Sequence, residues 1–143
     1  MEERSFTLDK QIIMFIETPK AQVSKSKEYT FNFLNELSNF RQLMPENISK
    51  FEVLNENRFL FALKGMPEIV LEKKEQTPYN KLILGAASEK LPFTLTADII
   101  ELENGKSEVV LSFSGEFNAM MAMMIKTPIT NFINTLSTNL EKI

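Results

Sequence analysis

The chain has 143 residues, a formal net charge of −3, no histidine and no cysteine, but 12 Phe and 8 Met. The missing types exclude disulfides, thiolate nucleophiles, Ser–His pairs and Cys- or His-based metal sites, which leaves carboxylate, Lys, Tyr or hydroxyl chemistry. The length predicts one domain over residues 1–143, and the negative charge argues against a nucleic-acid partner.

The N-terminal residues do not resemble a targeting segment. The chain opens with acidic residues, and the apolar run Ile12–Ile16 is too short for the core of a signal peptide. No stretch approaches the roughly 20 apolar residues that span a bilayer. We therefore expect a soluble, cytoplasmic protein, with residues 1–15 as an N-terminal extension or the start of the first strand. We expect no cofactor and no metal, because phosphate-loop and metal-ligand spacings are missing from the sequence.

The first predicted element is an extended segment, Gln11–Val23. Pro19 interrupts it and cannot donate a ladder hydrogen bond, so this strand should lie at a sheet edge or carry a bulge.

Ser24 and Ser26 are candidate N-caps for a following helix, with Glu28 in its first turn. One or two short helices should follow up to Pro45, with an apolar face made of Tyr29, Phe33, Leu34, Leu37 and Phe40.

Six antiparallel strands are predicted next, because apolar, β-favouring segments alternate with turn signals. The sharpest signal is Asn104-Gly105, which suits a type I′ hairpin turn with positive φ at both positions. The predicted strands are Ile48–Asn55, Arg58–Gly65, Glu68–Gln76, Lys81–Ser88, Phe93–Glu103 and Ser107–Glu116. Alternation within them gives an inward face that includes Phe59, Phe61, Leu63, Phe93, Leu95, Ala97, Ile99, Val109, Leu111 and Phe113.

The C-terminal segment has the clearest helical period in the chain. Pro128 lies within it, and because the apolar stripe keeps its phase across the proline, we predict one kinked helix. The stripe consists of Phe117, Met120, Met121, Met124, Ile125, Pro128, Ile129, Phe132, Ile133, Leu136, Leu140 and Ile143.

This order of elements makes an α+β fold in which one long helix covers one curved sheet. Several segments then resemble the START-like superfamily, also called SRPBCC or helix-grip proteins, from about Ile16 to the end. The resemblance, closest to small bacterial members, is carried by Ser26–Leu34 (SKEYTFNFL), Asn39-Phe40, Met44-Pro45, Pro92-Phe93 and the Met-rich segment that ends in Lys126–Phe132 (KTPITNF).

The resemblance implies a curved antiparallel sheet of about seven strands that wraps the long helix around an internal cavity. Such cavities take lipids, sterols, polyketides, quinones or other apolar molecules, and the superfamily includes carriers, cyclases, receptors and chaperone-activating modules. Fold therefore does not settle function. The residues we expect in the pocket are Phe59, Phe61, Leu63, Leu71, Leu84, Phe93, Leu95, Phe113, Phe117, Met120, Met121 and Met124.

Three kinds of function remain open. The first is non-catalytic binding or transport of a small hydrophobic molecule, which the Phe and Met content favours. The second is a cyclase- or dehydratase-type enzyme, for which Arg41, Glu68, Glu72, Tyr79 and Asp98 are the candidate catalytic residues. The third is a protein-interaction module, which would show an exposed apolar patch instead of a deep cavity, and for which Met123, off the main stripe, is a candidate surface residue.

Overall fold

The computed structural model describes residues 11–89 and 92–143, in which eight strands form one antiparallel sheet. The strand order is β1-β8-β7-β6-β5-β4-β3, and β2 pairs with β8 outside this path. The strands are β1 (Gln11–Glu17), β2 (Ala21–Val23), β3 (Ile48–Asn55), β4 (Arg58–Leu63), β5 (Ile69–Thr77), β6 (Lys81–Ala86), β7 (Phe93–Glu101) and β8 (Ser107–Asn118).

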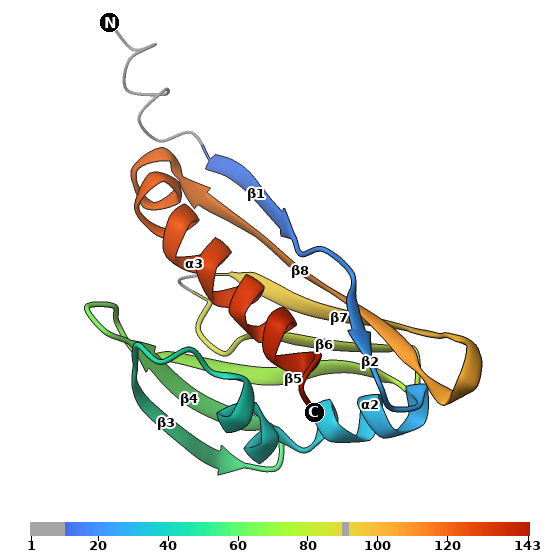
Figure 1. Cartoon of the computed structure of the whole chain (residues 1–143). Coiled ribbons are helices and arrows are strands. Elements are labelled where there is room, and N and C mark those ends of the chain that lie inside the picture. The colour runs from blue at the N-terminus through green and yellow to red at the C-terminus, as the bar shows by residue number, and fades with distance from the viewer. Residues whose placement is uncertain (1–10, 90–91) are drawn as a thin grey trace, which may run out of the picture.

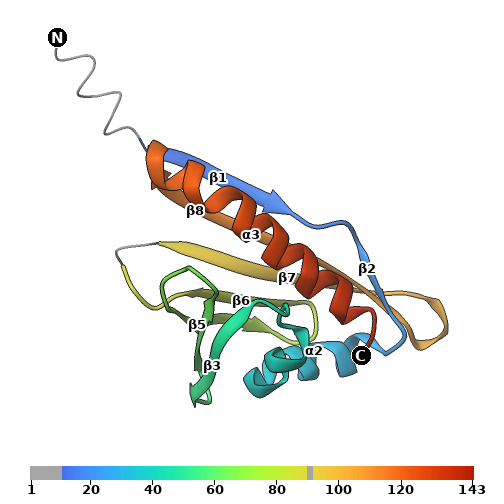
Figure 2. The same cartoon turned by 60° about the vertical axis from the view of Figure 1, so that its left-hand side comes forward.

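The helices lie on one side of this sheet. The long helix α3 (Ala119–Leu140) crosses its concave face, while α2 (Lys27–Asn35) and the 3-10 helix η1 (Leu37–Leu43) lie beside the C-terminal end of α3 (Figures 1 and 2). Asn139 of α3 fixes this end by donating from Nδ2 to the Leu43 carbonyl at 2.9 Å. The predicted helix-grip architecture is therefore confirmed.

The first predicted strand is two strands, which raises the count from about seven to eight. The chain leaves the sheet around Pro19 and returns at Ala21, and both β1 and β2 pair with β8. Thr18 bridges the interruption: its backbone N–H donates to the Leu111 carbonyl at 2.9 Å, and its hydroxyl accepts from the Leu111 N–H at 3.0 Å. The expectation of a sheet edge at Pro19 is confirmed.

Helix α2 begins as predicted, and its buried side differs from the predicted face in the first turn. Ser26 caps it by accepting from the Tyr29 N–H at 3.0 Å, and Glu28 lies in its first turn. The buried side chains are Thr30, Phe31 and Leu34, whereas Tyr29 is 48% exposed. Of the predicted face, Leu34, Leu37 and Phe40 are buried and Phe33 is half-buried against the core, so the prediction was wrong only at Tyr29.

The Asn104-Gly105 turn joins β7 to β8 as the sequence predicts. Asn104 has φ of 62° and Gly105 has φ of 70°, which are the two positive values of a type I′ turn. The Leu102 N–H donates to the Lys106 carbonyl at 2.8 Å across the turn. This local signal therefore fixes the register of the longest strand pair in the sheet.

Helix α3 runs through Pro128 as a single helix of 22 residues. Its N-cap is Asn118, whose Oδ1 accepts from the Met121 N–H at 2.8 Å. Phe117, which the periodicity assigned to the helix, is the penultimate residue of β8. The buried face of α3 consists of Ala122, Ile129, Phe132, Ile133, Leu136, Ser137 and Leu140. No helix within the described residues is long and apolar enough to cross a membrane.

A buried hydroxyl pair ties α2 to β8. The Oγ1 of Thr30 and the Oγ of Ser107 lie 2.9 Å apart, both residues are fully buried, and Ser107 Oγ also donates to the Lys25 carbonyl.

We expect Ser107→Ala to lower the free energy of unfolding by about 1–3 kcal/mol, because it leaves buried polar groups without partners. Urea unfolding measures this change. Ser114→Ala, on the outer face of the same strand, should change it by less than about 0.5 kcal/mol; equal effects would contradict the role of the pair.

Candidate functional site

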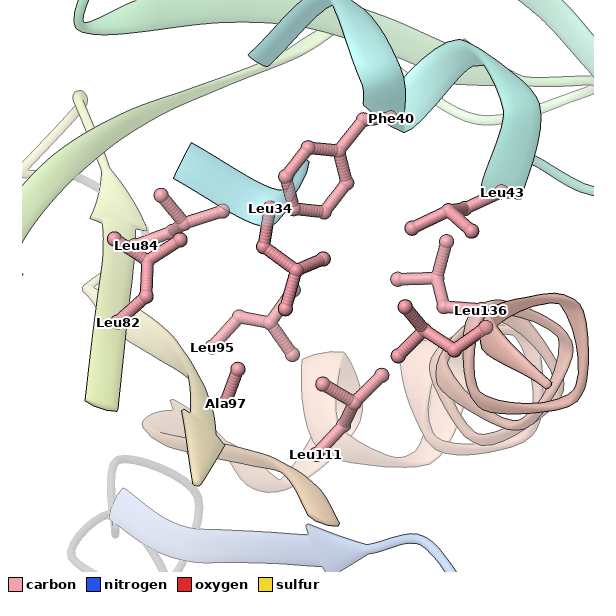
Figure 3. A pocket seen from close by; sticks show the side chains of 10 residues that line it. Leu34, Phe40, Leu43, Leu82, Leu84, Leu95, Ala97, Leu111 and Leu136 are labelled. Carbon is pink, nitrogen blue, oxygen red and sulfur yellow. The ribbon is translucent and has the colours of Figure 1, made fainter. Parts of the chain in front are cut away.

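The space between α3, the two short helices and the sheet is filled with aliphatic side chains. A void of about 10 Å³ is left, which is room for roughly one water molecule. Figure 3 shows how side chains from six elements converge on it. Its lining is entirely hydrocarbon and consists of Leu34, Phe40, Leu43, Leu82, Leu84, Leu95, Ala97, Leu111, Leu136 and Leu140.

Rows of phenylalanine rings flank this aliphatic centre. Phe59 stacks with Phe40 at 5.1 Å between ring centroids, and Phe61 stacks with Phe132 of α3 at 4.9 Å and 5°. Phe59 and Phe61 lie 6.0 Å apart, so they join the two stacks into one row along β4. A second row along β7 and β8 consists of Phe93, Phe113 and Phe117.

A groove opens where α3 meets the loop between β4 and β5. Its volume is about 310 Å³, and the buried side chains of Leu63 and Phe132 contribute to its lining. Since Phe132 also stacks on Phe61, this ring separates the groove from the phenylalanine row. The groove is lined by Pro45, Asn47, Leu63, Lys64, Met66, Thr127, Pro128, Asn131, Phe132 and Thr135.

The predicted pocket residues have different places in the structure. Leu84 and Leu95 line the internal void, and Leu63 lines the groove. Phe93 is half-buried, packs against the core beside Phe113 and borders two further grooves. The remaining predicted strand residues are buried in the core without lining either space, and they are Phe59, Phe61, Leu71, Phe113 and Phe117.

Two of the three predicted methionines point away from the interior. Met120 is 74% exposed and Met124 is 66% exposed, so neither lines an enclosed pocket, whereas Met121 is half-buried against the core. Met123 is 82% exposed, in line with its place off the predicted stripe. Over the first turns of α3, the side facing the sheet is occupied by Met121, Ala122 and Ile125.

Most residues around the void were not predicted to line a pocket. Ala97 and Leu111 were placed on the inward face of their strands, and Leu34, Phe40, Leu136 and Leu140 on apolar helix faces, but without a link to the pocket. Leu82 lies two residues before the predicted pocket residue Leu84 in the same strand, so alternation could have placed it on that face. Leu43 had no signal beyond being apolar. These side chains belong to separate helices and strands, so the space they share is defined only by the packing of those elements.

The candidate catalytic residues do not converge. Among the residues the structure describes, Glu68 pairs with Lys50 at 3.0 Å, Asp98 with Lys81 at 3.5 Å, and Glu72 with Arg58 at 2.8 Å. Arg41 lies over the Phe51 ring and donates to the Phe51 carbonyl, and the 39% exposed Tyr79 packs edge-on against Phe31. None of the five lines the void or the groove.

The ion pairs shift two pKa values on the surface. The hydrogen bond from Lys74 lowers the pKa of Glu72, and Arg58 adds to this effect. The hydrogen bond to Glu68 raises the pKa of Lys50. Both changes favour the charged forms, as expected of surface pairs. In residues 11–89 and 92–143, no three His, Cys, Asp or Glu side chains gather in a way that could hold a metal ion.

The fold is similar to solved structures of low sequence identity. Norcoclaurine synthase from Thalictrum flavum, in complex with dopamine and hydroxybenzaldehyde, has a TM-score of 0.67 and is 8% identical, with 92% of this chain and 88% of that chain covered. XoxI from Bacillus cereus has a TM-score of 0.66 at 10% identity, covering 92% and 93%. A protein of Thermus thermophilus, TTHA0849, has a TM-score of 0.65 at 11% identity, covering 90% and 95%.

No protein-family model and no curated protein sequence matches the chain. The structural likeness defines the class by its fold: the chain has the START-like (SRPBCC) helix-grip fold. At these identities the likeness extends to the fold and does not assign an activity.

Proposed function

We propose that the chain binds a small apolar molecule without transforming it, with the ligand entering between α3 and the sheet. The observation that carries this proposal is the groove of about 310 Å³ at their junction. Its volume falls at the lower end of small-molecule sites, which span about 300–1,000 Å³. Leu63 and Phe132 offer apolar contact, and Asn47, Asn131 and Thr135 offer hydrogen bonds that can orient a polar end.

The interior behind the groove is suited to hydrocarbon. Every residue around the void is apolar, so a polar group placed there would lose its hydrogen bonds to water without replacement. A ligand larger than one water molecule must displace side chains, since the void is about 10 Å³. Phe132 is the side chain that a ligand entering from the groove must displace, because it borders the groove and stacks on Phe61 of the core.

Two observations favour binding over catalysis. Acid–base chemistry needs a proton donor or acceptor within hydrogen-bond reach of the reacting atom, and none of the five candidate residues lines the groove or the void. Lys64 is the one ionisable residue among the described residues that line the groove, and no carboxylate or tyrosine lines the groove beside it. Glu68, Glu72 and Asp98 are instead held in surface ion pairs. The similar structure of norcoclaurine synthase contains dopamine and hydroxybenzaldehyde, which supports a site for small molecules in this fold but does not distinguish binding from catalysis.

Filling the groove tests this proposal without disturbing the core. Asn131 lines the groove with an exposed side chain, so Asn131→Trp should fill the space and leave the buried face of α3 unchanged. We expect the affinity for a fluorescent apolar probe to fall at least about tenfold, or about 1.4 kcal/mol. Probe titration measures the affinity, and native mass spectrometry with organic extraction identifies molecules that co-purify.

Asn134→Trp is the matched control. Asn134 is also exposed on α3, three residues further along, but it does not line the groove. The control should bind the probe as the unmodified chain does. Equal binding by all three proteins would place the probe elsewhere, and no binding by any of them would contradict the proposed function.

A further inference from the structure

Strand β1 is an edge strand whose outer side is unpaired in the described part of the chain. It pairs with β8 over seven consecutive residues without a register shift, and it ends the strand order of the sheet. Between Gln11 and Glu17 its residues are Ile, Ile, Met, Phe and Ile, with no charge and no proline. Ile13 is 74% exposed and Phe15 is 61% exposed. Such a long, apolar, regular edge is a template for pairing with another strand.

The other edges of the same sheet are protected. Strand β3 carries the charged Lys50 and Glu52, has two register irregularities against β4, and is covered at Phe51 by Arg41. These are devices that block edge-to-edge pairing. At β2, the Gln22 N–H donates to Glu141 Oε2 at 2.9 Å, so that edge is engaged by the end of α3. Within the described residues, this contrast marks β1 as the edge that no other segment covers.

The backbone of β1 directs N–H and C=O groups outward along this edge, where they can bond to a second strand. The Thr18 N–H donates to Leu111 of β8, and antiparallel bonding alternates along a strand. Ile16, Met14 and Ile12 therefore bond to β8, while Gln11, Ile13, Phe15 and Glu17 direct their N–H and C=O groups outward. Each outward residue can exchange two hydrogen bonds with a partner strand.

From these features we infer that β1 is the interface of a symmetric homodimer, in which two copies pair antiparallel through this edge. In the register that pairs all seven residues, the twofold axis passes through Met14. Ile13 then lies opposite Phe15 of the second copy, and Gln11 lies opposite Glu17. All four outward residues then meet outward residues of the second copy. The exposed Ile13 and Phe15 side chains of both copies form one apolar cluster on the outer face of the sheet.

The charges at the ends of β1 fit this partner. The Glu17 carboxylate lies opposite the Gln11 amide, which can donate to it, so no like charges meet across the interface. One patch that binds its own copy makes an isologous, closed contact, which stops at two chains. A dimer extends the sheet across both copies and brings the exposed apolar side chains of β1 into contact with those of the second copy.

Sedimentation velocity on the full chain tests this inference, at protein concentrations up to about 100 μM, where an edge contact with micromolar Kd is populated. We expect a species of twice the mass of one chain. Ile13→Lys/Phe15→Lys should weaken dimerisation at least tenfold, because it places like charges opposite each other on both sides of the axis. Leu54→Lys/Ile100→Lys adds the same charge at exposed positions away from β1, and should leave the dimer unchanged.

A second measurement checks the register. The chain has no cysteine, so Gln11→Cys/Glu17→Cys introduces the sole thiols, both at exposed positions. Mild oxidation should link two chains covalently, because the paired positions lie within disulfide reach in an antiparallel pair. A monomer at every concentration, a dimer that survives Ile13→Lys/Phe15→Lys, or a dimer that fails to cross-link would each overturn the inference.

Discussion

Phe132→Ala is expected to lower the free energy of unfolding by about 3–5 kcal/mol, which is the cost of removing a large buried ring. Phe132 is 5% exposed and stacks on Phe61 at 4.9 Å, so alanine removes both the buried area and the ring pair. The loss is a large part of the stability of a typical domain, about 5–15 kcal/mol. Equilibrium unfolding in urea measures it.

The same substitution should change ligand binding in the opposite direction. Without the Phe132 ring, the groove and the space around Phe61 become continuous, so an apolar probe should bind more tightly and recover part of the lost stability. Phe51→Ala is the control, because Phe51 is half-buried, packs on Phe59 at 5.4 Å between ring centroids and does not line the groove. It should lose less stability and gain no affinity. Weaker probe binding by Phe132→Ala would contradict the place of this ring between groove and core.

The elements that the sequence predicted correctly depend on local chemistry. The Asn104-Gly105 turn needs two positive φ angles, and the Ser26 cap needs a hydroxyl before a helix, so each can be recognised from a few neighbouring residues. The inward faces of the strands follow from alternation, which is also a local property. The fold could therefore be predicted to the level of elements and faces.

The division between β1 and β2 was not predictable from such patterns. Pro19 marks an interruption, but the return at Ala21 depends on pairing with Val109, about ninety residues away in sequence. The exposed methionines have a similar explanation. Periodicity identifies a face of α3, yet it does not show how much of that face the sheet covers, and Met120 and Met124 lie on its uncovered flank.

The internal void was the least predictable feature. Each side chain around it is an ordinary apolar core residue, and Leu34, Leu43, Leu82 and Leu136 come from four elements. Whether such residues leave space depends on shifts of less than one methyl group, because protein interiors pack at the density of organic crystals. Composition indicated an apolar interior, while the nearly filled centre follows from the packing of all six elements around it.

Leu136→Ala tests whether this interior can hold an apolar guest. Leu136 is fully buried and lines the void, so its truncation should lower the free energy of unfolding by about 2–5 kcal/mol and enlarge a space with hydrocarbon walls. Engineered apolar cavities of about 150 Å³ stay dry and bind benzene or xenon. We therefore expect benzene to raise the melting temperature of Leu136→Ala but not that of the unmodified chain, as measured by calorimetry.

Ala97 provides a matched control, because it lines the same void from β7 (Figure 3). The double variant Leu136→Ala/Ala97→Leu keeps the total side-chain volume, which cores tolerate better than a net change. It should recover part of the lost stability and lose the response to benzene. If benzene stabilises both variants equally, the guest binds outside the void. If it stabilises neither, the interior closes around the deletion, and a ligand must then bind in the outer groove alone.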